Sequence, residues 1–172
     1  MASGGELEAD LIVTATGLNM LALGGTELVV DGRTVELPKT MTYRGMMLSG
    51  VPNMAFVLGY TNASWTLKAD LTSEYVCRLL KHMHVRGYSQ CVPHNRDPSV
   101  TEQPLIDFSS GYVLRSIADF PKQGSKRPWR LHQNYALDLL TLRRAPIEDG
   151  TLEFSRHAPV MRSPQPALVT AA

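Results

Sequence analysis

The sequence predicts an α/β fold, and three segments carry this prediction. Leu11 to Ala15 and Met54 to Leu58 are short continuous apolar runs, LIVTA and MAFVL, which are typical of strands buried on both faces of a parallel sheet. The third segment, from about Trp65 to about His84, has the apolar spacing of an amphipathic helix. Because buried parallel strands need helices on the faces of their sheet, the three segments together favour an α/β arrangement.

Composition limits the class of protein. The chain has 172 residues, of which 44% are hydrophobic, enough for one domain with an ordinary core. The 17 Lys and Arg residues nearly balance the 16 Asp and Glu residues, so overall charge does not favour nucleic acid as a partner. The N-terminal MASGGELEAD lacks the pattern of a signal peptide, and no apolar run approaches the ~20 residues of a membrane span. We therefore expect a cytoplasmic location.

A hairpin is predicted between the two apolar runs. Asp31-Gly32 separates Leu28–Val30 from Thr34–Leu37, two segments in which apolar and polar residues alternate. Asp-Gly suits the left-handed conformation that a two-residue hairpin turn requires.

The predicted helix has a broad apolar stripe and recognisable ends. Glu74 and Arg78 are spaced to pair across one turn on its outer side, and Gly87 is a suitable stop. We expect the stripe to lie on the sheet. Its members are Leu67, Leu71, Tyr75, Val76, Leu79, Leu80 and Met83.

Beyond this helix the patterns are short. Residues 96–130 read mostly as connection, Tyr135 to Arg144 predicts one more short helix, and the residues after Gly150 predict a loose tail rich in proline.

The polar turn before the long helix is the first candidate site. A strand that ends at Gly59 and passes through Thr61, Asn62, Ala63 and Ser64 into a helix presents free N–H groups and the positive end of the helix dipole. Asn62 and Ser64 suit the N-cap position, and Gly59 and Ala63 would allow a flat ring to approach the backbone. The pattern predicts a site for an anion or an electron-rich oxygen; an ordinary capped helix is the alternative.

The end of the first apolar run is the second candidate. Thr16 and Gly17 follow LIVTA, at the carboxyl edge of the expected sheet, where open α/β folds bind ligands. The alternative is a core strand followed by a turn glycine.

Other constellations are weaker. Cys77, His82, His84, Cys91 and His94 lie close in sequence, but no CxxC or HxxxH spacing occurs, and His82 and His84 would point in different directions on a helix. We therefore expect no metal site. No catalytic residue is predicted either, because no serine lies in a GxSxG elbow and no cysteine has a recognisable histidine partner.

Basic residues gather in the C-terminal half, opposed only by Asp119 and Asp138. Such a cluster is usually a solvated face, and with Trp129 as its one large aromatic neighbour it makes a poor nucleic-acid platform; peripheral membrane contact and a partner surface are the alternatives. Its members are Arg115, Lys122, Lys126, Arg127, Arg130, Arg143 and Arg144.

Several motifs in a fixed order resemble a known family. They are DLIVTATGLN, YRGMMLSGVPNMAF, GYTNASWTLKADLTSEYVCRLL, GYVLRS, PKQGS and PWRLHQNY, and they extend from about Asp10 to about Arg144. Together they resemble the C-terminal third of flavin-containing monooxygenases of the Baeyer-Villiger type, closest to the ethionamide-activating group.

The resemblance implies the C-terminal part of a Rossmann-like FAD/NAD(P)-binding domain, with an incomplete three-layer sheet and a mostly irregular basic tail. Residues 1–20 would end a nicotinamide-domain strand and cross back, residues 21–95 would complete the FAD domain, and residues 96–172 would form the tail. Thr16 and Gly17 would lie where the chain leaves the NADPH domain. Gly59 and Thr61 to Ser64 would face the pyrimidine edge of the flavin.

The resemblance also implies a chemistry. NADPH reduces FAD in this family, and a flavin peroxide formed with O2 oxygenates a ketone or a soft sulfur compound. The glycine-rich fingerprints for FAD and NADPH are absent from the 172 residues. We therefore expect the isolated chain to be inactive and to need an N-terminal polypeptide as its partner.

Two alternatives come from other classes. A non-catalytic interaction module would use the basic tail to bind a protein or membrane partner. A disulfide reductase would need a redox CxxC, which these residues lack, although that motif would normally lie upstream.

Overall fold

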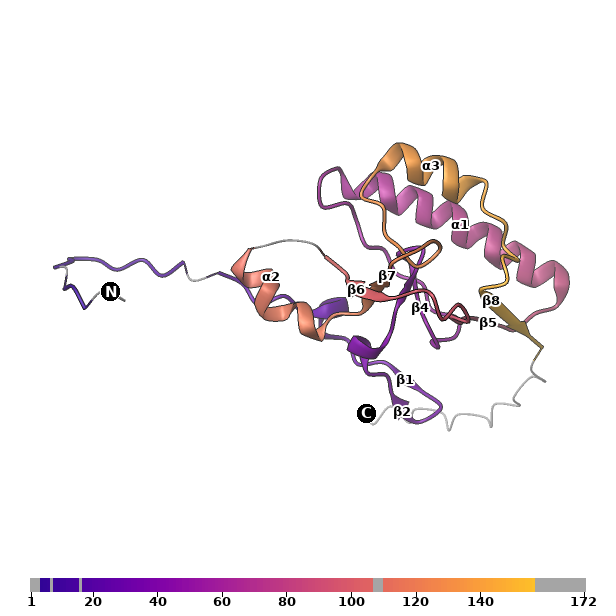
Figure 1. Ribbon diagram of the computed structural model, residues 1–172, viewed down its shortest axis with the longest axis horizontal. Coiled ribbons are helices and arrows are strands. Elements are labelled where there is room, and N and C mark those ends of the chain that lie inside the picture. Colours follow the sequence, from indigo (N-terminus) through magenta and orange to yellow (C-terminus); the bar gives the residue numbers. More distant parts are fainter. Residues whose placement is uncertain (1–3, 7, 16, 107–109, 157–172) are drawn as a thin grey trace, which may run out of the picture.

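The computed structural model describes residues 4–6, 8–15, 17–106 and 110–156, and these form a mixed helix and strand structure (Figure 1). The α-helices are α1 (Trp65–Arg86), α2 (Gly111–Ser116) and α3 (Tyr135–Arg143). Single turns of 3₁₀-helix are η1 (Ala22–Gly25), η2 (Leu37–Lys39) and η3 (Ile117–Asp119).

The strands form four separate antiparallel pairs. They are β1 (Val29–Val30) with β2 (Arg33–Thr34), β3 (Thr42–Tyr43) with β4 (Met47–Leu48), β5 (Gln90–Pro93) with β8 (Leu152–Ser155), and β6 (Glu102–Pro104) with β7 (Lys122–Gly124). Helices and strands are thus mixed as predicted, but the described strands do not join into one parallel sheet, so the Rossmann-like assignment stays a prediction.

The predicted hairpin is confirmed. Val29 pairs with Thr34 and Val30 with Arg33, and both turn residues have positive φ, 49° at Asp31 and 77° at Gly32. A two-residue turn of this kind matches the right-handed twist of the strands that it joins.

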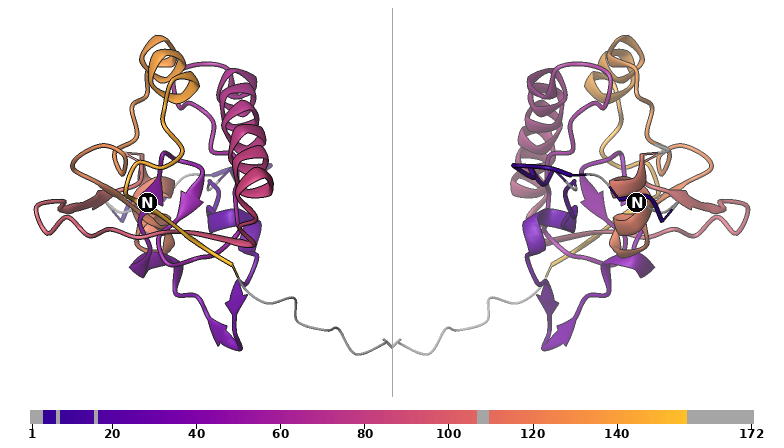
Figure 2. Two further views of the ribbon diagram at one scale, coloured as in Figure 1. Left: turned by 90° about the vertical axis from the view of Figure 1, so that its right-hand side faces the viewer. Right: turned by 90° about the vertical axis from the view of Figure 1, so that its left-hand side faces the viewer.

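The long helix is confirmed and ends two residues later than expected. Gly87 adopts the left-handed conformation, and its N–H donates to the carbonyls of His84 and Met83. The apolar stripe packs partly against α3, which runs beside α1 (Figures 1 and 2). The predicted pairing of Glu74 with Arg78 is wrong, because Glu74 instead binds Arg143 on α3. Arg78 donates to the backbone carbonyls of Leu142, in the last turn of α3, and of Ala145, just after it.

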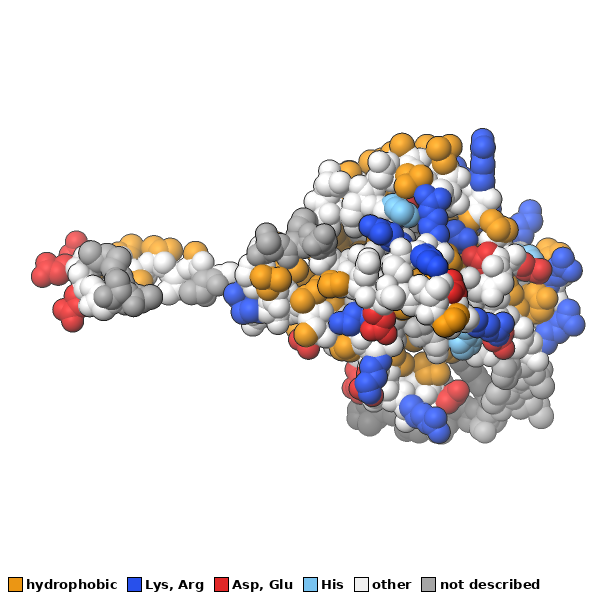
Figure 3. All heavy atoms as spheres, viewed as in Figure 1, with side chains coloured by type: hydrophobic (Ala, Val, Ile, Leu, Met, Phe, Trp, Pro, Cys, Tyr) orange, Lys and Arg blue, Asp and Glu red, His pale blue; other side chains and the backbone are white. Residues whose placement is uncertain are grey.

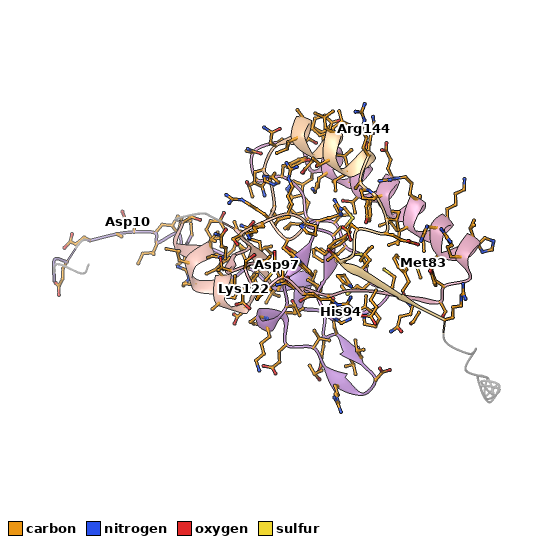
Figure 4. All side chains as sticks on the ribbon, turned by 45° about the vertical axis from the view of Figure 1, so that its right-hand side comes forward. Asp10, Met83, His94, Asp97, Lys122 and Arg144 are labelled. Atoms are coloured by element: carbon orange, nitrogen blue, oxygen red, sulfur yellow. The ribbon has the colours of Figure 1, made fainter. Side chains whose placement is uncertain are left out.

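The two predicted buried strands do not form. Leu11, Ile12 and Val13 are 81%, 78% and 80% exposed and belong to an extended arm that carries Asp10 away from the body (Figure 4). Residues 54–58 are also without strand structure and alternate between partial burial and exposure. A strand needs a ladder of backbone partners. Residues 54–58 have one such bond, from the N–H of Phe56 to the Met46 carbonyl at 2.8 Å, and no described strand pairs with residues 11–15.

The C-terminal half holds more structure than expected. Residues 96–130 contain β6, α2 and β7, and the segment after Gly150 forms β8, which pairs with β5. The short helix over residues 135–143 is confirmed, and the Asn134 side chain accepts from the N–H of Leu137 at its start. The rest of the predicted tail lies outside the described residues.

Two apolar clusters hold the body together. The larger joins α1, α3 and the β3–β4 and β5–β8 pairs; its most buried large members include Tyr43, Met46 and Tyr75. The smaller surrounds Ala22, Leu105 and Phe120, and the candidate site adjoins it.

Candidate functional site

The turn of residues 59–64 opens toward solvent at the start of α1. Gly59 and Tyr60 are buried, whereas Thr61 to Ser64 are exposed. Ser64 occupies the N-cap position, but its side chain makes no capping bond; its hydroxyl lies 2.7 Å from that of Thr66. The N-terminal end of α1 is therefore without a side-chain cap, which leaves its positive end available to a ligand.

Gln133 fixes this turn, and the sequence reasoning missed it. The N–H and the hydroxyl of Thr61 both donate to Gln133 Oε1, at 2.9 and 3.2 Å. The Asn62 amide donates to the Gln133 carbonyl at 3.0 Å, so Asn62 tethers the turn and does not cap α1. Gln133 lies about seventy positions away in the sequence, and the only signal for it was its place in the motif PWRLHQNY.

Two adjoining hollows flank the turn, and Thr61 and Gln133 line both of them. The first has a volume of about 640 Å³ and a mixed lining, in which polar side chains such as Gln103 and His132 alternate with apolar ones such as Leu131. The second has a volume of about 680 Å³, and its walls are mostly apolar. Aromatic side chains of the second hollow are Phe56, Tyr60, Trp65, Tyr112 and Phe120. A ligand with a flat apolar body and a polar edge matches this division.

The glycine at the start of the turn does accommodate a flat ring, but the ring belongs to the chain itself. The indole of Trp65 lies against Gly59 so closely that a Cβ at position 59 would overlap it. The Trp65 side chain is nevertheless 60% exposed and lines the apolar hollow.

A buried ion pair stabilises the turn through Tyr60. The Tyr60 hydroxyl donates to Asp138 at 2.8 Å, and Lys68 Nζ lies 2.7 Å from the same carboxylate oxygen. Burial raises the pKa of Tyr60, and the hydrogen bond to Asp138 raises it further, so Tyr60 stays a protonated donor. The turn, α1 and α3 are thereby held in one arrangement.

The second predicted site does not join the first. Thr16 lies outside the described residues. Gly17 lies in the exposed arm with φ of 96°, close to Arg115, and lines neither hollow. Its role in cofactor binding stays a prediction.

Neither a metal-binding group nor a membrane-spanning helix occurs among residues 4–6, 8–15, 17–106 and 110–156. There, no group of three or more His, Cys, Asp and Glu side chains could hold a metal ion. In the same ranges no helix combines the length and the apolar character needed to cross a membrane.

Comparison with known proteins gives a consistent group of relatives. No family model and no solved structure matches the chain. The chain is 55% identical over 159 residues to the FAD-containing monooxygenase EthA of Mycobacterium tuberculosis and 50% identical over 157 residues to EthA of Mycolicibacterium smegmatis. It is 41% identical over 170 residues to the "probable FAD-binding monooxygenase AlmA" of Acinetobacter baylyi.

These matches cover 92%, 91% and 98% of the chain but only 32%, 32% and 34% of the respective relatives. They confirm the resemblance that the motifs indicated, and their extent fits a C-terminal third. The interaction-module alternative is not favoured by them. The chain spans about a third of the length of the relatives it matches, and over that third it is homologous to the FAD-containing monooxygenases.

Proposed function

We propose that this chain supplies the C-terminal third, with the flavin-facing turn, of an FAD- and NADPH-dependent monooxygenase that oxygenates ketones or soft sulfur compounds. The observation that carries the proposal is the position of Thr61, which lies in the turn just before the uncapped start of α1 and lines both a hollow of mixed polarity and a mostly apolar one. Homology to FAD-containing monooxygenases supports the choice of ligand.

The residues present fit one edge of a flavin. The exposed segment from Thr61 to Ser64 and the first N–H groups of α1 would face the pyrimidine edge, where reduction of the ring places negative charge. The apolar hollow would take part of the ring and exclude water from it. Trp65, which lines that hollow, would contact the ring face through its exposed side.

Bound FAD would supply the redox chemistry, in which two electrons from NADPH and one O2 would give an oxygenated substrate and one water. The polypeptide corresponding to the unmatched two-thirds of the relatives would supply the glycine-rich nucleotide fingerprints. We therefore expect little turnover from the 172-residue chain alone.

A chimera tests the proposal. The region of the Mycobacterium tuberculosis relative that matches this chain is replaced by the corresponding residues of this chain, and the purified protein is assayed for FAD content and for NADPH oxidation with a ketone and with a thioether. The relative with its own C-terminal third and the relative lacking that third are the controls. We expect FAD content close to that of the unaltered relative and NADPH oxidation that depends on substrate. A folded chimera without FAD would contradict the proposal.

A further inference from the structure

Members of the basic cluster in the C-terminal half differ in whether a carboxylate lies beside them. Arg143 binds Glu74 at 2.7 Å, and Lys126 lies 4.0 Å from Asp97, so these two cations have carboxylate neighbours. Arg127, Arg130 and Arg144 form no ion pair with any described residue.

The three arginines line two hollows beside α3, and Arg127 lines both of them. The larger hollow, about 440 Å³ in volume, is lined by Arg44, Arg127 and Arg144. A smaller one of about 30 Å³ is lined by Arg44, Arg127 and Arg130 together with Lys68. Figure 3 shows Lys and Arg side chains gathered on this face below α3, and Arg144 lies at the end of that helix (Figure 4).

The acidic groups lining these hollows are already engaged. Asp149 accepts from Arg44 at 2.8 Å and from the Tyr43 hydroxyl, and Asp138 is shared by Lys68 and Tyr60. The inner cations are therefore neutralised by their own partners. The charges of Arg127, Arg130 and Arg144 are not balanced by any carboxylate that lines either hollow.

The charges of this cluster affect the neighbouring His132. The Arg127 Nε–H donates to His132 Nε2 at 3.1 Å, which requires the unprotonated nitrogen at that position. Burial lowers the pKa of His132, and the charges of Arg127, Arg130 and Lys68 lower it further, against the opposing charge of Asp138. An anion in this region would relieve the repulsion among the guanidinium groups.

We propose that Arg127 and Arg144, with Arg130 in the neighbouring small hollow, form a binding site for the phosphate or pyrophosphate group of a small molecule. Guanidinium groups offer paired N–H donors that match phosphate oxygens, and the hollow shared by Arg127 and Arg144 is large enough for such a group. The arginines are exposed, so binding is expected to weaken as the salt concentration rises. The site does not depend on the proposed flavin turn.

Inorganic pyrophosphate is the first probe, with the 172-residue chain titrated at constant ionic strength. Calorimetry gives the dissociation constant, and NMR follows the ring protons of His132. We expect saturable binding and a raised pKa of His132. Arg127→Gln and Arg144→Gln should each weaken binding by about tenfold, because each removes a charged donor.

Arg143→Gln is the matched control, since Arg143 is adjacent in sequence and also exposed but already bound to Glu74. Its affinity for pyrophosphate should be unchanged. Equal weakening by Arg143→Gln and Arg144→Gln, or an identical response to sodium chloride at matched ionic strength, would overturn the proposal.

Two further titrations separate the sources of the phosphate group. ADP should bind with the same dependence on Arg127 and Arg144, whereas vesicles of phosphatidylcholine containing phosphatidic acid should not compete for the site. Binding to the vesicles without binding to pyrophosphate or ADP would assign the cluster to a lipid surface and overturn the small-molecule site.

Discussion

Lys68 and Asp138 form a buried ion pair in which Nζ lies 2.7 Å from Oδ2, with side chains only 5% and 7% exposed. Lys68 belongs to the first turns of α1 and Asp138 to α3, and the Tyr60 hydroxyl donates to the same oxygen. One carboxylate therefore joins both helices to the turn of the candidate site.

Removal of one partner of this pair should destabilise the chain. In Lys68→Met, the buried Asp138 carboxylate loses its cation and keeps the hydrogen bond from Tyr60. We expect the free energy of unfolding, measured with urea, to fall by about 3 kcal/mol. Arg143→Gln, which breaks the exposed pair with Glu74, should cost much less, because solvent screens exposed charges. Equal losses in the two variants would show that burial of the Lys68 pair is unimportant.

Asp149 should make stability depend on acid pH. Burial by itself would raise its pKa, but hydrogen bonds from Tyr43, the Thr151 amide and Arg44, with the Arg44 charge, hold it below the ordinary value of 3.8. Stability from a lowered pKa is present above the unfolded value and is lost as pH falls through the folded one.

The free energy of unfolding should therefore fall more steeply below about pH 4 in the wild type than in Asp149→Asn. The measurement is a series of urea titrations from about pH 6 to pH 2. Parallel curves for the two proteins would rule out this role for Asp149.

The two cysteines should differ in reactivity. Cys91 is buried, and burial followed by the charge of Asp149 raises the pKa of its thiol to about 11, whereas Cys77 is exposed. Because the thiolate is the reactive form, a disulfide reagent near pH 8 should modify Cys77 quickly and Cys91 only after unfolding. Cys77→Ser should abolish the fast phase. Equal rates for both thiols in the folded chain would disagree with the burial of Cys91.

Gly59→Ala tests the contact with Trp65. The added methyl group would overlap the indole, so we expect Trp65 to move and the free energy of unfolding to fall by about 1–3 kcal/mol. In a Trp65→Ala background the same substitution should cost much less. Tryptophan fluorescence and urea titration measure both effects, and an equal cost in the two backgrounds would exclude the contact as the cause.

Local signals in the sequence were sufficient for some elements. The hairpin at Asp31-Gly32 depends on the conformation of two adjacent residues, and α1 depends on an apolar spacing within one segment with a glycine at its end. Each signal comes from residues that are neighbours in the sequence, so the sequence alone could predict the hairpin and α1.

Strand pairing depends on residues that are distant in sequence, and there the prediction failed. LIVTA has the composition of a buried strand but finds no partner among the described segments, whereas Leu152–Ser155 pairs with Gln90–Pro93 without a strong pattern of its own. The site shows the same limit. The turn before α1 was predicted, but its tether to Gln133 and the hollows around it arise from packing between distant segments.

The affinity of the turn for flavin is the central claim, and Asn62→Ala in the chimeric monooxygenase tests it most directly. Loss of the Asn62 tether to Gln133 should loosen the turn and raise the dissociation constant for FAD about tenfold, or shift the reduction potential of the bound flavin. Asn95→Ala, an exposed asparagine outside both hollows, is the control and should change neither. Affinity and reduction potential that remain unchanged in Asn62→Ala, in a chimera that binds FAD, would contradict the assignment of the turn to the flavin.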